Sequence, residues 1–69
     1  MSEAVKVPAD VLEGLEYVRE SGETNMFDRR AVQKIASREG YYATLLWLED
    51  HQKEYAEGIF SGFAVSEEA

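Results

Sequence analysis

The spacing of apolar residues along the chain indicates an amphipathic helix near its start. Four of them recur at positions that share one helix face: Val11, Leu12, Leu15 and Val18. Pro8 suits the first helical turn, where its missing N–H has no helical partner, and Gly22 suits the left-handed residue after a last turn. The pattern therefore predicts a helix over about residues 8–20.

The same periodicity indicates two further helices. The apolar face of the second holds Phe27, Ala31, Val32, Ile35 and Ala36. Gly40 follows this face, so the second helix is predicted over about 27–39. The apolar face of the third holds Tyr41, Leu45, Leu48, Gln52, Tyr55 and Ile59. Gly62 ends that pattern, which predicts a helix over about 41–60. Three helices with short connections predict an all-α fold, a compact three-helix bundle.

The residues that connect the first two helices can each be given a structural role. Gly22 permits the reversal of the chain, and Asn25 or Asp28 can accept hydrogen bonds from the N–H groups at the start of the second helix. Met26 and Phe27 are expected to fill the gap between the two helices. Both Asn25→Ala and Phe27→Ala should then lower thermal stability, the latter by about 3–5 kcal/mol if the ring is buried.

The length of the chain limits how it can be stabilised. With 69 residues we expect a single helical domain over 1–69, with flexible ends at about 1–6 and 64–69. A domain of this size buries only about 60% of the surface that its unfolded chain exposes. Disulfides are excluded because the chain has no cysteine. An economical helical core or a homodimer therefore has to supply the stability.

The formal net charge of -7 narrows the classes of partner. It argues against general affinity for nucleic acids or anionic membranes, because like charges repel. The chain has only three lysines (Lys6, Lys34 and Lys53), so its acidic excess would also suit a halophilic cytoplasm, in which salt screens the repulsion. The alternative is an ordinary, well-solvated acidic surface.

The chain shows no signal for membrane insertion or secretion. No apolar run approaches the roughly 20 residues that span a bilayer, and the first residues lack the pattern of a signal peptide. The absence of cysteine also fits a reducing compartment. We therefore expect a soluble, cytoplasmic protein that does not associate with membranes.

No set of residues indicates catalysis or metal binding. His51 is the only histidine, and although Asp50 and Glu54 lie near it, no further His or Cys completes a metal shell. The glutamates fall at solvent-facing helical positions, and no serine has a histidine in its sequence context. We therefore expect no metal, no cofactor and no enzymatic activity.

Basic residues are concentrated on the second predicted helix, which carries Arg29, Arg30, Lys34 and Arg38. Three of these share one helix face, at positions 30, 34 and 38. One interpretation is internal balance, because the first and third helices are acidic. The other is a contact surface for phosphates or for an acidic partner protein. In a helix-turn-helix arrangement the acidic third helix would be repelled by DNA, so only the second helix could dock first.

Aromatic residues provide a second candidate contact surface. The chain has one Trp, four Tyr and three Phe, and three helices can bury only a limited number of large rings. Trp47 lies beside the apolar face of the third helix, and Tyr42 and Phe60 are also off its centre. Trp and Tyr are favoured anchors in protein interfaces. We therefore treat Trp47 as a candidate partner contact, with completion of a small core as the alternative.

One segment of the chain has a recognisable sequence. Residues 19–28 read Arg-Glu-Ser-Gly-Glu-Thr-Asn-Met-Phe-Asp, and they are followed by Val32, Ile35-Ala36, Gly40-Tyr41, His51, Tyr55, Ile59 and Gly62. Over about residues 8–62 the chain resembles a family of small uncharacterised proteins, encoded mainly by phages and prophages, that share Arg-x-Ser-Gly-x-Thr-Asn-Met-Phe-Asp. The resemblance implies a compact helical module of viral or mobile-element origin. It implies no catalytic residues.

These observations favour a non-enzymatic, helical interaction module that binds a protein partner. The expected contact residues are Arg29, Arg30, Lys34, Arg38 and Trp47. The alternative is a small nucleic-acid-binding regulator that uses the basic face of the second helix.

Overall fold

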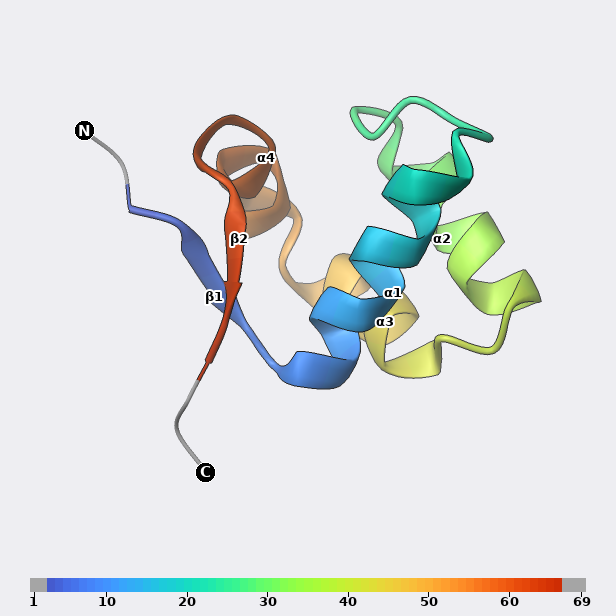
Figure 1. Ribbon diagram of the computed structural model, residues 1–69, viewed down its shortest axis with the longest axis horizontal. Helices are drawn as coiled ribbons and strands as arrows, with labels where there is room; N and C mark the ends of the chain where they lie inside the picture. The colour runs from blue at the N-terminus through green and yellow to red at the C-terminus, as the bar shows by residue number, and fades with distance from the viewer. Residues whose placement is uncertain (1–2, 67–69) are drawn as a thin grey trace.

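The computed structural model describes residues 3–66 and contains four helices and two short strands (Figure 1). Their bounds are β1 Val5–Val7, α1 Ala9–Ser21, α2 Arg29–Arg38, α3 Tyr42–Asp50, α4 Gln52–Ser61 and β2 Phe63–Val65. The protein is mostly helical, but the prediction of an all-α three-helix bundle is wrong. The third predicted helix is two helices, and the segments that flank the helical region pair as a sheet.

The helix α1 begins and ends close to the predicted positions. Pro8 is the residue before its first turn, in an extended conformation, and its carbonyl accepts a hydrogen bond from the N–H of Leu12 at 3.0 Å. Gly22 follows the last turn with φ of 67°, in the left-handed region, and donates its N–H to the carbonyl of Arg19. The proline and glycine signals in the sequence therefore located this helix to within a residue.

The helix α2 is capped as its sequence indicated. The Asp28 carboxylate accepts a hydrogen bond from the N–H of Ala31 at 3.2 Å, and the Asn25 side-chain oxygen accepts one from Phe27 at 2.8 Å. At the other end Gly40 has φ of 83°. Asp28 caps the helix and Asn25 shapes the turn, so both polar residues act locally.

The predicted third helix is interrupted at His51, whose φ of -130° and ψ of 49° are not helical. His51 still donates its N–H to the carbonyl of Trp47 at 2.9 Å, so α3 closes its last turn before α4 starts. A straight helix of 20 residues would be about 30 Å long, close to the 31 Å longest dimension of the whole molecule. The break instead turns α4 back, which lets Tyr55 reach the core and places α4 against β1.

The two strands form a parallel sheet that joins the two ends of the described chain. Val5 pairs with Phe63, and Val7 with Val65. Figure 1 shows this sheet at the opposite side of the molecule from α2, with α4 behind it. Parts of both segments expected to be flexible, about 1–6 and 64–69, therefore lie in the sheet; residues 1–2 and 67–69 lie outside the described part. Val7 is fully buried and links the sheet to the core.

The core draws on β1 and all four helices. Its buried members are Val7, Val11, Leu15, Val18, Val32, Ile35, Trp47, Leu48 and Tyr55. The helices α1 and α3 approach each other closely at Gly14, where a Cβ would overlap the side chain of Thr44. The hydroxyl of Thr44, which is fully buried, donates a hydrogen bond to the carbonyl of Val11 at 3.1 Å. A small residue on one helix and a hydroxyl on the other thus allow the two backbones to pack closely without an unpaired polar group.

A second close approach positions β2 against α4. A Cβ at Gly58 would overlap the ring of Phe63, which also stacks on Tyr55 with ring centroids 5.7 Å apart. Gly58 therefore provides the space in which Phe63 lies. This arrangement shapes the surface described next, because Phe63 is only partly buried there.

Candidate functional site

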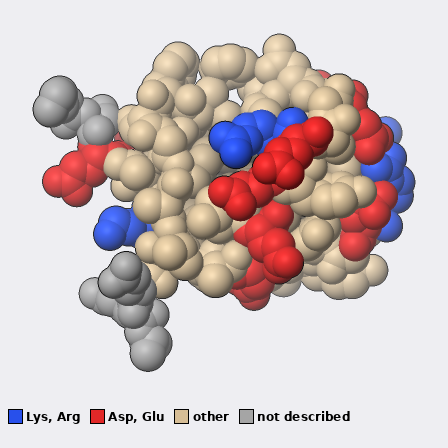
Figure 2. Space-filling model, in the orientation of Figure 1, with Lys and Arg blue, Asp and Glu red and all other residues tan. Residues whose placement is uncertain are grey.

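The basic face of α2 that holds Arg30, Lys34 and Arg38 is exposed. Arg30 and Lys34, together with Gln33, Ser37, Arg38 and Leu45, line a shallow depression. Figure 2 shows Lys and Arg side chains on the edge of the molecule that α2 forms in Figure 1, with Asp and Glu side chains directly beside them. The positive charge is therefore local and adjoins an acidic surface.

Arg38 is engaged within the molecule. Its guanidinium makes two parallel hydrogen bonds to the Glu23 carboxylate, at 2.9 and 2.7 Å, and a third to Glu39 at 2.9 Å. Hydrogen bonding to Glu23 raises the pKa of Arg38, and the same bonds lower the pKa of Glu23. This ion pair links the α1–α2 connection to the end of α2. The geometry of Arg38 therefore favours the first interpretation, in which the basic residue balances acidic residues of the same molecule.

The remaining basic residues of α2 fall into two kinds. Arg29 is partly buried and donates a hydrogen bond to the side-chain oxygen of Gln33. Arg30 and Lys34 are exposed and form no ion pair with residues 3–66. Of the four predicted basic contacts, these two are the cations that remain available to a partner.

Trp47 is a core residue and not an exposed anchor. Trp47 is 9% exposed, its ring stacks on the His51 ring with centroids 4.9 Å apart, and it lies nearly perpendicular to the Phe63 ring with centroids 6.2 Å apart. The expectation that Trp47 is displayed to a partner is therefore wrong, whereas Tyr42 and Phe60 are exposed. Within α3, Trp47 shares the buried face with Thr44 and Leu48, so the buried face of this helix is offset from the predicted one.

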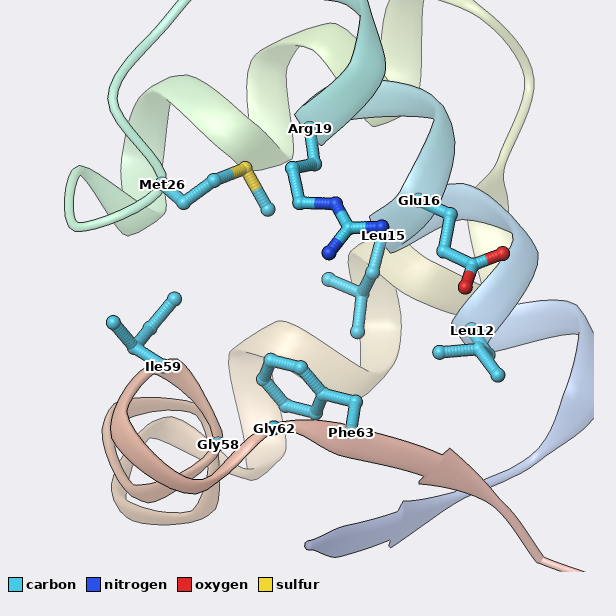
Figure 3. A pocket seen from close by; sticks show the side chains of 9 residues that line it. All are labelled: Leu12, Leu15, Glu16, Arg19, Met26, Gly58, Ile59, Gly62 and Phe63. Carbon is cyan, nitrogen blue, oxygen red and sulfur yellow. The ribbon is translucent and has the colours of Figure 1, made fainter.

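An apolar groove that the sequence did not reveal lies between α1, α4 and β2. Its lining includes Leu12, Leu15 and Arg19 from α1, Met26 from the following loop, Ile59 from α4 and Phe63 from β2. The groove encloses about 230 Å³. In Figure 3 the Phe63 ring lies beneath the open space, below Leu15, and the Met26 and Ile59 side chains point into that space at one end. The lining residues are distant in sequence, so only the fold brings them together.

Two charged side chains of α1 border this groove. The Arg19 side chain extends into the open space, and Glu16 lies toward the Leu12 end (Figure 3). Arg19 is exposed, and its guanidinium makes no hydrogen bond or ion pair with any residue of the described chain. The groove therefore combines apolar walls with one available cation and one anion.

An exposed aromatic pair adjoins the groove. Phe27 is 65% exposed and Phe60 is 80% exposed, and their ring centroids are 5.7 Å apart. Each ring follows a groove residue in sequence, Met26 and Ile59 respectively. The expectation that Phe27 fills the gap between the first two helices is therefore wrong: Met26 turns inward and Phe27 packs outward on Phe60. The one sequence signal was Phe60 itself, a large apolar residue off the predicted buried face.

Among residues 3–66 no group of three or more His, Asp or Glu side chains is placed to hold a metal ion. Within the same residues no helix has the length and apolar content needed to cross a membrane.

Comparisons with known proteins place the chain in a family. Neither the curated proteins nor the solved structures contain a match to it. A family model described as "Domain of unknown function (DUF5049)" matches residues 8–63, which run from the residue before α1 to the first residue of β2. The chain therefore belongs to this family of domains of unknown function.

Proposed function

We propose that this protein is a non-enzymatic helical interaction module that binds a protein partner through the apolar groove and the adjoining Phe27–Phe60 pair. The observation that carries the proposal is the exposure of these two rings, which contact each other outside the core. Large exposed apolar side chains next to a groove are typical of protein-binding surfaces, because covering them removes apolar area from water. Trp47, which is buried, has no direct part in this contact.

The proposal also covers the origin of the protein, its location in the cell and its oligomeric state. The segment from Arg19 to Asp28 resembles a segment of phage and prophage proteins, so we propose a viral or prophage origin and a cytoplasmic location. The same exposed pair could also join two copies as a homodimer, since small domains often gain stability by self-association. Light scattering across protein and salt concentrations separates a homodimer from a monomer that binds another protein.

A second candidate function is nucleic-acid binding by the basic face of α2. It is supported by Arg30 and Lys34, which line a shallow depression and have no ion pair within the described residues. It is weakened by the engagement of Arg38 and by the net charge of -7. Affinity for DNA or RNA that falls steeply with added salt, and that Arg30→Glu/Lys34→Glu abolishes, would support this candidate.

Affinity capture from the lysate of the native host tests the first proposal. The bait is the full chain, compared with Phe60→Ser and with Leu46→Ser as a matched control, because Leu46 is 63% exposed on α3 and does not line the groove. We expect one defined protein to be retained by the wild type and by Leu46→Ser but lost with Phe60→Ser. Circular dichroism of each variant verifies that it is folded.

The other outcomes are equally informative. Equal recovery of the partner by Phe60→Ser and the wild type would contradict a role for the aromatic pair. Loss of the partner only with Arg30→Glu/Lys34→Glu would transfer the contact to the basic face of α2. Retention of no defined protein by the wild type would contradict the interaction module.

A further inference from the structure

We infer that the groove takes one large apolar side chain from a partner segment whose neighbouring carboxylate pairs with Arg19. The partner sequence recognised is thus apolar and acidic at adjacent or nearly adjacent positions. This inference rests on the proposed function, since it names what that surface recognises. Three features of the groove lead to this inference. They are the size of the groove, the lack of an acceptor for the Arg19 guanidinium among residues 3–66, and the charges that surround the groove.

The size of the groove fits a side chain better than a separate ligand. It encloses about 230 Å³, whereas small-molecule pockets usually measure about 300–1,000 Å³. Its walls are apolar at both ends, from Leu12 to Met26 and Ile59, with Phe63 between them. A Leu, Met or Phe side chain anchored on a partner backbone meets these walls and needs no further enclosure.

The Arg19 guanidinium supplies the polar part of the recognition. It extends over the apolar lining and has no acceptor among residues 3–66 (Figure 3). A carboxylate beside it would form a charge-assisted hydrogen bond, which is shorter and stronger than a neutral one. An apolar side chain in the groove would also displace water around this bond and so strengthen it.

The charges around the groove restrict the register of such a segment. Glu16 lines the groove toward Leu12 and repels a carboxylate placed at that end. The rest of the molecule carries an excess of acid, with a net charge of -7. A partner carboxylate is therefore favourable beside Arg19 and unfavourable at neighbouring positions. The energy difference between these positions of the carboxylate makes the groove selective. Burial of an apolar side chain alone would accept many partner sequences.

A peptide selection tests the inference directly. A phage-displayed library of random peptides, each about 12 residues long, is selected on the immobilised full chain. Binding of enriched synthetic peptides is then measured by fluorescence anisotropy with the wild type, Arg19→Gln, Lys53→Gln and Ile59→Ser, the last of which alters a residue of the groove lining. Lys53 is the matched control, because it is an exposed cation of α4 that does not line the groove.

The expected result has two parts. Enriched peptides carry Leu, Met or Phe with an Asp or Glu nearby, and Arg19→Gln weakens their binding about tenfold or more while Lys53→Gln leaves it unchanged. Enrichment of apolar peptides without acid, or equal affinity for Arg19→Gln, would overturn the assignment to Arg19. Failure of Ile59→Ser to weaken any enriched peptide, or the absence of enrichment, would overturn the groove as the site.

These failures are separable from failure of the proposed function. If the peptide result is negative but Phe60→Ser still loses the captured protein, the interaction module stands and only its recognition rule is wrong. If Phe60→Ser does not affect capture, and neither Arg19→Gln nor Ile59→Ser affects peptide binding, both proposals are wrong.

Discussion

The hydroxyl of Tyr55 donates a hydrogen bond to the backbone carbonyl of Met26, which lies 29 positions earlier in the chain. This bond fastens the connection between α1 and α2 to the side of α4. It also holds Met26 at the groove and leaves the next residue, Phe27, directed at Phe60. One hydrogen bond therefore helps to define both parts of the proposed contact surface.

Tyr55→Phe should lower the free energy of unfolding by about 1–2 kcal/mol, because it leaves a partly buried carbonyl without its donor. Urea denaturation followed by circular dichroism measures the change. Tyr42→Phe is the control, since Tyr42 is exposed, and should stay within about 0.5 kcal/mol of the wild type. A similar stability for both variants would show that the bond contributes nothing.

Stability should also fall at high pH because of Tyr55. Burial, with a smaller contribution from the charge of Asp28, raises its pKa from 10.0 to about 12. The unfolded chain therefore loses this proton at a lower pH than the folded protein does. The contribution of protonated Tyr55 to the free energy of unfolding is therefore complete below pH 10 and declines between pH 10 and about 12. Urea titrations over this pH interval should show the difference in stability between wild type and Tyr55→Phe becoming smaller. A difference that stays constant with pH would contradict the raised pKa of Tyr55.

Gly14→Ala should destabilise the protein by roughly 1–3 kcal/mol, because its Cβ would overlap Thr44. The sign is diagnostic: at an uncrowded helical position the same change is stabilising by about 0.5–1 kcal/mol. In a double-mutant cycle with Thr44→Ala, the two effects should not add, since removing the Thr44 side-chain atoms relieves part of the overlap. Additive losses would indicate that the two helices do not meet at this pair.

Phe27→Ala should cost less than about 1 kcal/mol of stability, far below the loss expected for a buried ring, because the side chain is mostly exposed. Leu48→Ala, at a fully buried position, is the contrasting variant and should cost about 2–5 kcal/mol. Thermal denaturation of both variants distinguishes the two environments. A loss near that of Leu48→Ala would place Phe27 in the core after all.

The helices α1 and α2 could be predicted from sequence because their signals are local. Pro8, Gly22, Asp28 and Gly40 act within one turn of their own positions, and the bounds of α1 and α2 differ from the predictions by only a residue or two. Periodicity also identified most of the buried residues of these helices, although it missed Gly14 and included the exposed Phe27. Local chemistry was sufficient there.

The rest of the fold depends on contacts between distant residues, which periodicity does not encode. The break at His51 has neither glycine nor proline to mark it, and the only hint was a polar residue, Gln52, within the predicted apolar face. The strands are three residues each, too short to establish an alternating pattern. The groove was missed for the same reason: its walls come from α1, α4 and β2, which only the completed fold assembles.

The parallel pairing of β1 with β2 has a consequence for the order of folding. During synthesis Val5 emerges long before Phe63, its neighbour in the sheet, exists. The strand β1 therefore stays without its partner strand until the four helices that lie between the strands, and β2 itself, have been synthesised. Folding of this domain can finish only when nearly all of it has left the ribosome.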